Sequence, residues 1–342
     1  MTKMMRAAVI DALGQPLQLR ELPIPQPGPG EVLIRIAASG VCHTDISVMD
    51  GEWLMKRPRF PLVPGHEAAG FIAGVGSGVT THKEGDRVGA YWLSSACGAC
   101  DDCSDGHESL CLRQEGTGYD RNGTYADYCV VNAGFAVPLP AGNFENLAPV
   151  MCAGVTSYRG LKEMKLRPGS WVVVYGVGGT GHLGIQYAKA MGHKVIAIDI
   201  EAAKVAEATA LGAELAINCE REFPVNKILR HTGGGAHGVL ATAPAAKALE
   251  QSVRMLRRGG TCILIGIPKE PLPLNVFDMV IKGLSVRGSL IGTRDDLREA
   301  LQLVSEGKVT PLVENRPLDE VNEAIGAMRQ RQVKGRVVLR MI

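Results

Sequence analysis

The chain has 342 residues, of which 46% are hydrophobic and 21% are charged, and its formal net charge at pH 7 is +2. This length predicts two domains with large cores, and the scattered charges exclude a basic block that would bind nucleic acid or anionic lipid. No apolar run is long enough to span a membrane and no signal peptide is visible, so we expect a cytoplasmic protein whose nine cysteines stay reduced.

The first 150 residues are rich in glycine and proline, with short strand-like runs such as residues 31–40 and 86–93 between turn signals. This pattern predicts an irregular, mostly β domain. Directly after the first run, the sequence "CHTD" places Cys42, His43 and Thr44 next to Asp45. Thiols and imidazoles are zinc ligands, so this segment is a candidate for metal binding.

A second cysteine-rich segment follows in "CGACDDCSDGHESLC" at residues 97–111. Its spacing is C-x2-C-x2-C-x7-C, and four thiolates in a tight loop can close the tetrahedral shell of a structural zinc ion. An iron–sulfur cluster is the competing interpretation, although the proline that usually follows such a run is missing. A disulfide-bonded loop is the third interpretation, and the reducing environment of the cytoplasm disfavours it.

Several cysteines and histidines lie outside this loop, and they could form a second metal site. The candidates are Cys42 with His43, the "PGHE" at residues 64–67, and Cys152. Three protein ligands with an open fourth position are typical of catalytic zinc. Spacing alone does not establish the site, because an isolated buried cysteine is more often a small core residue.

From Trp171 onward, apolar β-branched runs alternate with alanine-rich helical segments, which predicts a parallel sheet covered by helices. The predicted strands are residues 171–176, 194–199, 214–218, 238–243, 261–266 and 284–291. Six such strands form a doubly wound α/β sheet. The later segments 295–308, 321–330 and 335–341 follow the sixth strand, so we expect them to return to the first domain.

A glycine-rich motif lies directly between the first of these strands and its helix. In "VVVYGVGGTGHLGIQYAKAMG", Gly176, Gly178 and Gly181 form G-x-G-x-x-G, a pattern that lets the backbone approach a pyrophosphate at a helix N-terminus. The second strand ends in Asp199, about 20 residues later, where a carboxylate can bind ribose hydroxyls. An acid repels a 2′-phosphate, so NAD is preferred over NADP. A structural turn, with Asp199 as a helix cap, is the alternative.

Taken together, the motifs resemble those of the zinc-dependent, medium-chain alcohol dehydrogenases, in the short bacterial and yeast-like ethanol/propanol-type group. The resemblance covers the whole chain and rests on "GVCHTD", "PLVPGHEAAG", "CGACDDCSDGHESLC", "CAGVTSYRGLK", "GVGGTGHLGIQYAKAMG", "GGAHGV", "GSLIGTRDDLREAL" and "GRVV". It implies a GroES-like catalytic domain at residues 1–153, a Rossmann domain at 154–290 and a return to the catalytic domain at 291–342.

The resemblance also implies roles for individual residues. The catalytic zinc ligands are Cys42, His66 and Cys152, and the structural zinc ligands are Cys97, Cys100, Cys103 and Cys111. The implied cofactor-binding residues are His43, Gly176, Gly178, Gly179, Gly181, Asp199, Lys204 and Arg336. Thr44 binds the substrate oxygen, Asp45 orients His66, and Glu67 is the acid beside the metal. Trp53 and Trp92 narrow the substrate pocket. Ser47 occupies a position where many relatives carry a proton-relaying histidine.

The function implied by the resemblance is reversible hydride transfer between a small to medium primary alcohol or its aldehyde and NAD, with two zinc ions per chain, in a homotetramer. Two other classes stay open from the residues alone. A metal-free reductase would keep the glycine motif but would not need Cys42, His66 and Cys152 together. A zinc-organised binding module would need the four clustered cysteines and neither the glycine motif nor the second zinc.

Overall fold

The computed structural model describes residues 3–52 and 58–341, which divide into two compact units. Unit 1 comprises Met1–Ala153, Thr293–Ser305 and Pro311–Ile342, and unit 2 comprises Gly154–Gly292 with Glu306–Thr310. Unit 1 is therefore discontinuous in sequence. No helix in the described part of the chain combines the length and apolar character needed to cross a membrane.

Unit 1 is built around a seven-stranded sheet in the order β16-β17-β3-β4-β5-β9, with β8 also paired to β3. All neighbours are antiparallel except β16 and β17. Two small hairpin sheets, β1-β2 and β6-β7, complete its β structure. The strands of unit 1 are β1 (Met4–Val9), β2 (Gln18–Pro23), β3 (Glu31–Gly40), β4 (Ala68–Val75), β5 (Arg87–Ala90), β6 (Leu93–Ser95), β7 (Glu115–Gly116), β8 (Tyr128–Asn132), β9 (Val137–Pro138), β16 (Val313–Pro317) and β17 (Arg336–Arg340).

The central strand β3 is almost continuously apolar, and residues on both of its faces are buried. A strand of this kind needs partners on both edges as well as cover on both faces. The chain supplies these partners from distant segments, because β4 pairs along one edge of β3 while β17 and β8 pair along the other. The return of the last segments to the first domain, predicted above, brings β17 to this position.

The helices of unit 1 vary in length from 4 residues in α2 to 12 residues in α10. They are α1 (His43–Met49), α2 (Asp101–Ser104), α3 (Phe144–Leu147), α10 (Arg294–Ser305) and α11 (Val321–Arg329), with the 3-10 turns η1 (Glu108–Leu110), η2 (Ala133–Phe135), η3 (Ala148–Met151) and η4 (Leu318–Glu320). One expected strand is wrong in extent. The run at residues 86–93 is split, because Tyr91 and Trp92 interrupt it and β6 leaves the main sheet to pair with β7.

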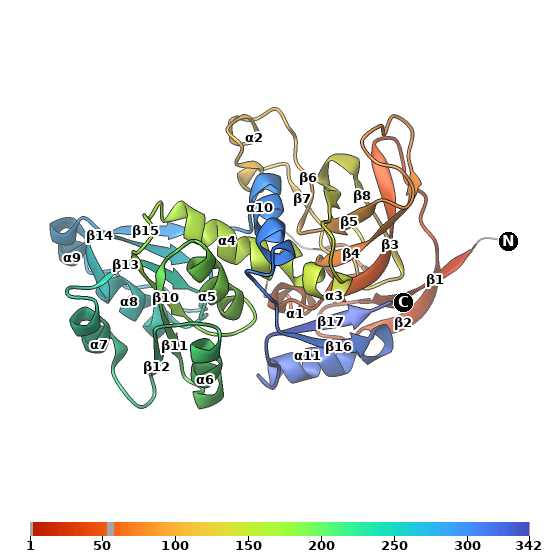
Figure 1. The fold of residues 1–342 in the computed structure, drawn as a ribbon. Coiled ribbons are helices and arrows are strands. Elements are labelled where there is room, and N and C mark those ends of the chain that lie inside the picture. Colours follow the sequence, from red (N-terminus) through yellow and green to blue (C-terminus); the bar gives the residue numbers. More distant parts are fainter. Residues whose placement is uncertain (1–2, 53–57, 342) are drawn as a thin grey trace. The chain divides into compact units, whose positions relative to one another are not determined.

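Unit 2 contains the predicted parallel sheet, in the order β12-β11-β10-β13-β14-β15. Its strands are β10 (Trp171–Tyr175), β11 (Lys194–Asp199), β12 (Leu215–Asn218), β13 (Ala236–Ala241), β14 (Leu256–Leu264) and β15 (Ser285–Gly288). Its helices are α5 (Gly181–Ala190), α6 (Ala202–Ala210), α7 (Pro224–His231), α8 (Ala246–Arg254) and α9 (Val276–Lys282), while α4 (Ala153–Glu163) starts at the unit boundary. In Figure 1, α5 and α6 (green) lie on one side of this sheet and α7 and α8 (teal) on the other.

This strand order confirms the doubly wound α/β fold. Numbered within the sheet it reads 3-2-1-4-5-6, and the order reverses between β10 and β13. Ligands of such sheets bind at the carboxyl ends of the strands beside this reversal. The glycine motif directly follows β10, so the fold places it at the expected binding edge.

Candidate functional site

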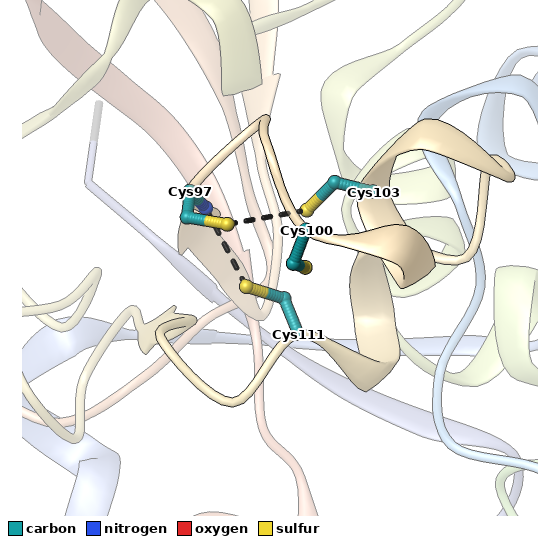
Figure 2. Close-up of side chains that lie close together, drawn as sticks. All are labelled: Cys97, Cys100, Cys103 and Cys111. Carbon is teal, nitrogen blue, oxygen red and sulfur yellow. Dashed lines mark hydrogen bonds between the residues drawn. The ribbon is translucent and has the colours of Figure 1, made fainter.

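Four cysteines converge in the loop between β6 and β7. The sulfurs of Cys97, Cys100, Cys103 and Cys111 all lie within 4.8 Å of one another, and the Sγ atoms of Cys97 and Cys103 are 3.9 Å apart. Figure 2 shows the four side chains pointing toward a common centre. Four sulfurs bound tetrahedrally to zinc at about 2.3 Å would be about 3.8 Å apart. The cysteines are free, so this geometry fits one zinc ion and not a disulfide.

The cysteine loop is tied to the returning segment by a half-buried ion pair between Glu108 and Arg294. The Glu108 side chain is 9% exposed and accepts hydrogen bonds from the Arg294 backbone N–H at 3.1 Å and from its Nε at 2.8 Å. The Arg294 guanidinium also lies over the Phe135 ring, 4.7 Å from its centroid. Sequence reasoning did not identify this pair, because 186 residues separate its members.

A second group of potential metal ligands lies at one end of the main sheet of unit 1. One ligand atom each from Cys42, His66, Glu67 and Cys152 lies within 4.8 Å of the others, and the Sγ atoms of Cys42 and Cys152 are 3.8 Å apart. The structure thus brings together three ligands that the resemblance implied, with Glu67 beside them. The hydrogen bond between the two sulfurs lowers the pKa of Cys42 well below its ordinary value and, together with burial, raises the pKa of Cys152 well above it.

Local structure explains the position of Cys42. It is the N-cap of α1: its sulfur accepts from the Thr44 backbone N–H at 3.5 Å, and the Asp45 carboxylate accepts from the Cys42 backbone N–H at 3.1 Å. This is a capping box built from C-x-x-D. The "CHTD" sequence therefore starts a helix and fixes the thiol by the same hydrogen bonds.

Asp45 is the centre of a buried network around the histidine. Its Oδ1 accepts from His66 Nδ1 at 2.9 Å and from the Gly65 N–H at 3.2 Å, and its Oδ2 accepts from the Tyr125 hydroxyl at 2.6 Å. Burial disfavours the charged imidazole, but the Asp45 charge and hydrogen bond raise the pKa of His66 well above its usual value. Tyr125 was not identified from the sequence, since no short motif connects it to Asp45.

This network leaves one ring nitrogen of His66 available to bind a metal ion. With Nδ1 donating to Asp45, the opposite ring nitrogen of His66 can present its lone pair to a cation. That atom, Nε2, is buried and has no hydrogen-bond partner among the described residues. A buried polar atom without a partner is costly, and a metal bound by Cys42, Cys152 and His66 would satisfy it. The donor set fits zinc with an open fourth position.

Glu67 and Arg336 form a fully buried ion pair beside these ligands. The Glu67 side chain is 0% exposed and that of Arg336 is 5% exposed, and Arg336 Nη2 donates to Glu67 Oε1 and to the Val41 carbonyl. Burial raises the pKa of Glu67 to about 7 although the Arg336 charge opposes this shift. Arg336, which the resemblance implied as a pyrophosphate contact, is thus directed in this structure at the acid beside the metal ligands.

The other implied catalytic residues lie on or near α1. His43 is exposed, whereas Thr44 and Ser47 are half-buried. Trp92 is buried, and its ring meets the His66 ring edge-on with centroids 5.3 Å apart. Trp92 therefore lies against one of the implied metal ligands, and its role in a substrate pocket stays a prediction. Trp53 lies outside the described residues.

In unit 2, the glycine motif has the geometry of a dinucleotide cradle. Gly176 has a φ of +99°, and a Cβ at Gly181 would lie 1.7 Å from the Gly176 carbonyl oxygen, so neither position tolerates a side chain. A Cβ at Gly178 would meet nothing within 4 Å, which leaves open space at the start of α5. The Thr242 hydroxyl, at the end of β13, donates to the Gly176 carbonyl at 2.9 Å. An anion can approach this positive helix end.

Asp199 is the last residue of β11 and lies beside the glycine motif, and its ribose-binding role stays a prediction. Its Oδ2 accepts from the Val177 backbone N–H at 2.7 Å and its Oδ1 from the Glu201 N–H at 3.0 Å. The carboxylate therefore also holds the glycine loop, a function that its spacing did not indicate. Lys204 Nζ donates to Glu201 Oε1 at 2.7 Å.

Comparison with known proteins agrees with this arrangement. A family model described as an alcohol dehydrogenase GroES-like domain matches residues 28–141, and one described as a zinc-binding dehydrogenase matches residues 179–306. An alcohol dehydrogenase of Geobacillus stearothermophilus is 47% identical over 98% of this chain and 100% of its own length. One of Rhizobium meliloti (strain 1021) is 48% identical over 98% of each chain.

Solved structures give the same result. The alcohol dehydrogenase from the archaeon Aeropyrum pernix has a TM-score of 0.91 at 31% identity, covering 98% of this chain and 100% of that chain. A crystal structure described as an NAD-dependent alcohol dehydrogenase has a TM-score of 0.90 at 31% identity, with coverage of 98% and 100%. The chain belongs to the zinc-dependent, medium-chain alcohol dehydrogenase family.

Proposed function

We propose that the protein catalyses reversible hydride transfer between a small to medium primary alcohol or its aldehyde and NAD. The observation that carries this proposal is the buried Nε2 of His66, which has no hydrogen-bond partner among the described residues, in a group whose ligand atoms lie within 4.8 Å of one another and include those of Cys42 and Cys152. A metal-free reductase would have no need of such a set, and a binding module held together by the cysteine loop would not need the dinucleotide cradle of unit 2.

The chemistry divides between cofactors and protein. When bound, zinc supplies a Lewis acid for the alcohol oxygen and NAD supplies the hydride acceptor. Cys42, His66 and Cys152 hold the metal, and Asp45 keeps the imidazole of His66 in the ligating tautomer. The Thr44 hydroxyl hydrogen-bonds the substrate oxygen. The Ser47 hydroxyl can relay a proton but cannot hold one near neutral pH, so the proton leaves through water or another base.

The proposed selectivity has two structural supports. Trp92 packs against His66, so the space beside the metal ligands is bounded by a large ring, which favours small alcohols. In unit 2, the Asp199 carboxylate offers acceptors to ribose hydroxyls and repels a 2′-phosphate, which favours NAD. Lys204 is proposed as a further cofactor contact.

We also propose that the protein is a cytoplasmic homotetramer that binds neither nucleic acid nor membranes. All nine cysteines are free, in keeping with a reducing compartment. On α9, Val276, Phe277 and Val280 are 70%, 71% and 71% exposed, and an apolar surface of this kind supports association between subunits.

Metal analysis with a substrate panel tests this function. Wild-type protein should contain two zinc ions per chain and form NADH from short primary alcohols. Cys152→Ser should retain one zinc, lose turnover and keep a wild-type circular dichroism spectrum, since an open metal site contributes less to folding than a closed one. The matched variant Cys103→Ser should instead lower the melting temperature. One zinc in the wild type, or full activity in Cys152→Ser, would contradict the assignment.

A further inference from the structure

Gly40, the last residue of β3, lies between the two backbone segments that carry the Glu67–Arg336 ion pair. On one side its backbone N–H donates to the Glu67 carbonyl at 3.0 Å. On the other side it is paired in register with Val338 of β17, two residues after Arg336. Residues two apart on a strand project to the same face, so Arg336 is a diagonal neighbour of Gly40.

The backbone does not explain a glycine at this position. Gly40 is not among the residues of positive φ, so an alanine could adopt its conformation. Glycine in a strand often marks a place where another group approaches closely. Here the close group is a side chain: a Cβ on Gly40 would lie 2.0 Å from Glu67 Oε2 and 2.9 Å from Glu67 Cδ. The Glu67 carboxylate occupies the volume that any other residue would fill.

The position of this carboxylate matters for charge. One of its oxygens lies within 4.8 Å of the ligand atoms of Cys42, His66 and Cys152. Two thiolates would balance a divalent cation, Glu67 balances Arg336, and the Asp45 carboxylate beside His66 adds one further negative charge. If Glu67 were displaced, the positive charge of Arg336 would remain buried near the cation without its partner, and cation binding would weaken.

We infer that Gly40 is a positioning residue of the metal site: the absence of a side chain there lets Glu67 meet Arg336 beside Cys42, His66 and Cys152, and thereby raises the affinity for zinc. This inference depends on one part of the proposed function, namely that Cys42, His66 and Cys152 bind zinc.

The test measures zinc affinity by competition with a chelator in Gly40→Ala. We expect the affinity of the site at Cys42 to fall by about 10- to 100-fold, the effect of changing groups that orient metal ligands. Zinc in the four-cysteine loop serves as an internal reference and should be unaffected. Gly74→Ala is the matched control, since Gly74 lies in β4 of the same sheet and its added Cβ would approach no atom closer than 3.8 Å.

A double-mutant cycle separates this role from general packing. In a Glu67→Ala background the clashing carboxylate is gone, so Gly40→Ala should cause no further loss of zinc affinity. Gly40→Ala alone could fail to fold. If the double variant then folds, this result would also support the inference. Unchanged affinity in Gly40→Ala, an equal loss in both backgrounds, or misfolding in both would overturn it. A wild type that holds zinc only in the four-cysteine loop would instead refute the proposed function.

Discussion

Asp45→Asn is the substitution that most directly tests how the histidine ligand is held. The carboxylate accepts four hydrogen bonds, from the Cys42 N–H, the Gly65 N–H, His66 Nδ1 and the Tyr125 hydroxyl, and the residue is 2% exposed. The amide keeps one oxygen but places an NH2 group against two of these donors. In the better orientation of the amide, its oxygen still accepts from Gly65 and His66. The NH2 group then faces the Tyr125 hydroxyl, which can rotate to accept from it, and the Cys42 N–H, which is left unpaired.

The expected cost follows from this count. Losing a hydrogen bond to a charged acceptor costs about 1.5–3 kcal/mol, and an unpaired buried donor costs about 1–3 kcal/mol more. The free energy of unfolding of the metal-free protein should therefore fall by roughly 2.5–6 kcal/mol. Zinc affinity at the Cys42 site should fall by about 10- to 100-fold, because the imidazole loses its charged partner.

Tyr125→Phe is the matched control, as it removes one donor to Asp45 and leaves the bond to His66 intact. It should lower the free energy of unfolding by about 1.5–3 kcal/mol with little effect on zinc affinity. Denaturant unfolding and chelator competition provide the two measurements. Equal loss of zinc affinity in both variants, or wild-type affinity in Asp45→Asn, would refute the assignment of Asp45 as the residue that orients the ligand.

Two further predictions concern the cofactor and the proton. Replacing Asp199 by Gly together with Ile200→Arg should shift the ratio of kcat/KM for NADP over NAD by about 10- to 100-fold, as expected for one charge-assisted hydrogen bond gained or lost. NAD affinity should fall as well, because the Val177 N–H loses its acceptor; a wild type that already prefers NADP would contradict this reasoning. Ser47→His should raise single-turnover alcohol oxidation by up to about 10²-fold above pH 6.5, where the imidazole is neutral and accepts protons, with less gain at high pH. Superimposable pH profiles of variant and wild type would show that position 47 is not on the proton path.

The sequence predicts best the features that are local in the chain. The four loop cysteines lie within 15 residues, so their spacing alone indicated convergence, and the glycine motif lies within one strand–turn–helix unit. His66 and Cys152 are separated from Cys42 by long stretches of chain, and residue spacing left their association open. The resemblance to a family supplied that hypothesis, and the structure places the three ligand atoms together.

What the sequence did not predict depends on strand register and buried contacts between distant segments. No motif connects Tyr125 with Asp45 or Arg294 with Glu108, since each contact exists only after the sheet of unit 1 has formed. The break between β5 and β6 was missed because apolar residues on both sides of it read as one strand. The contact of Arg336 with Glu67 follows from the pairing of β17 with β3, which spacing cannot reveal.

The position of β17 inside the main sheet, between β16 and β3, has a consequence for synthesis on the ribosome. Gly40 and β17 are separated by roughly 300 residues, which take about 15–60 s to translate at usual elongation rates. Unit 2, encoded almost entirely between them, can emerge and fold during this interval. Over the same time the end of β3 at Ala38–Gly40, which pairs with β17, lacks its partner on that edge, although β8 can already pair with Glu31–Arg35. Nascent chains stalled before Arg336 should therefore depend on chaperones, because an unpaired strand edge promotes aggregation.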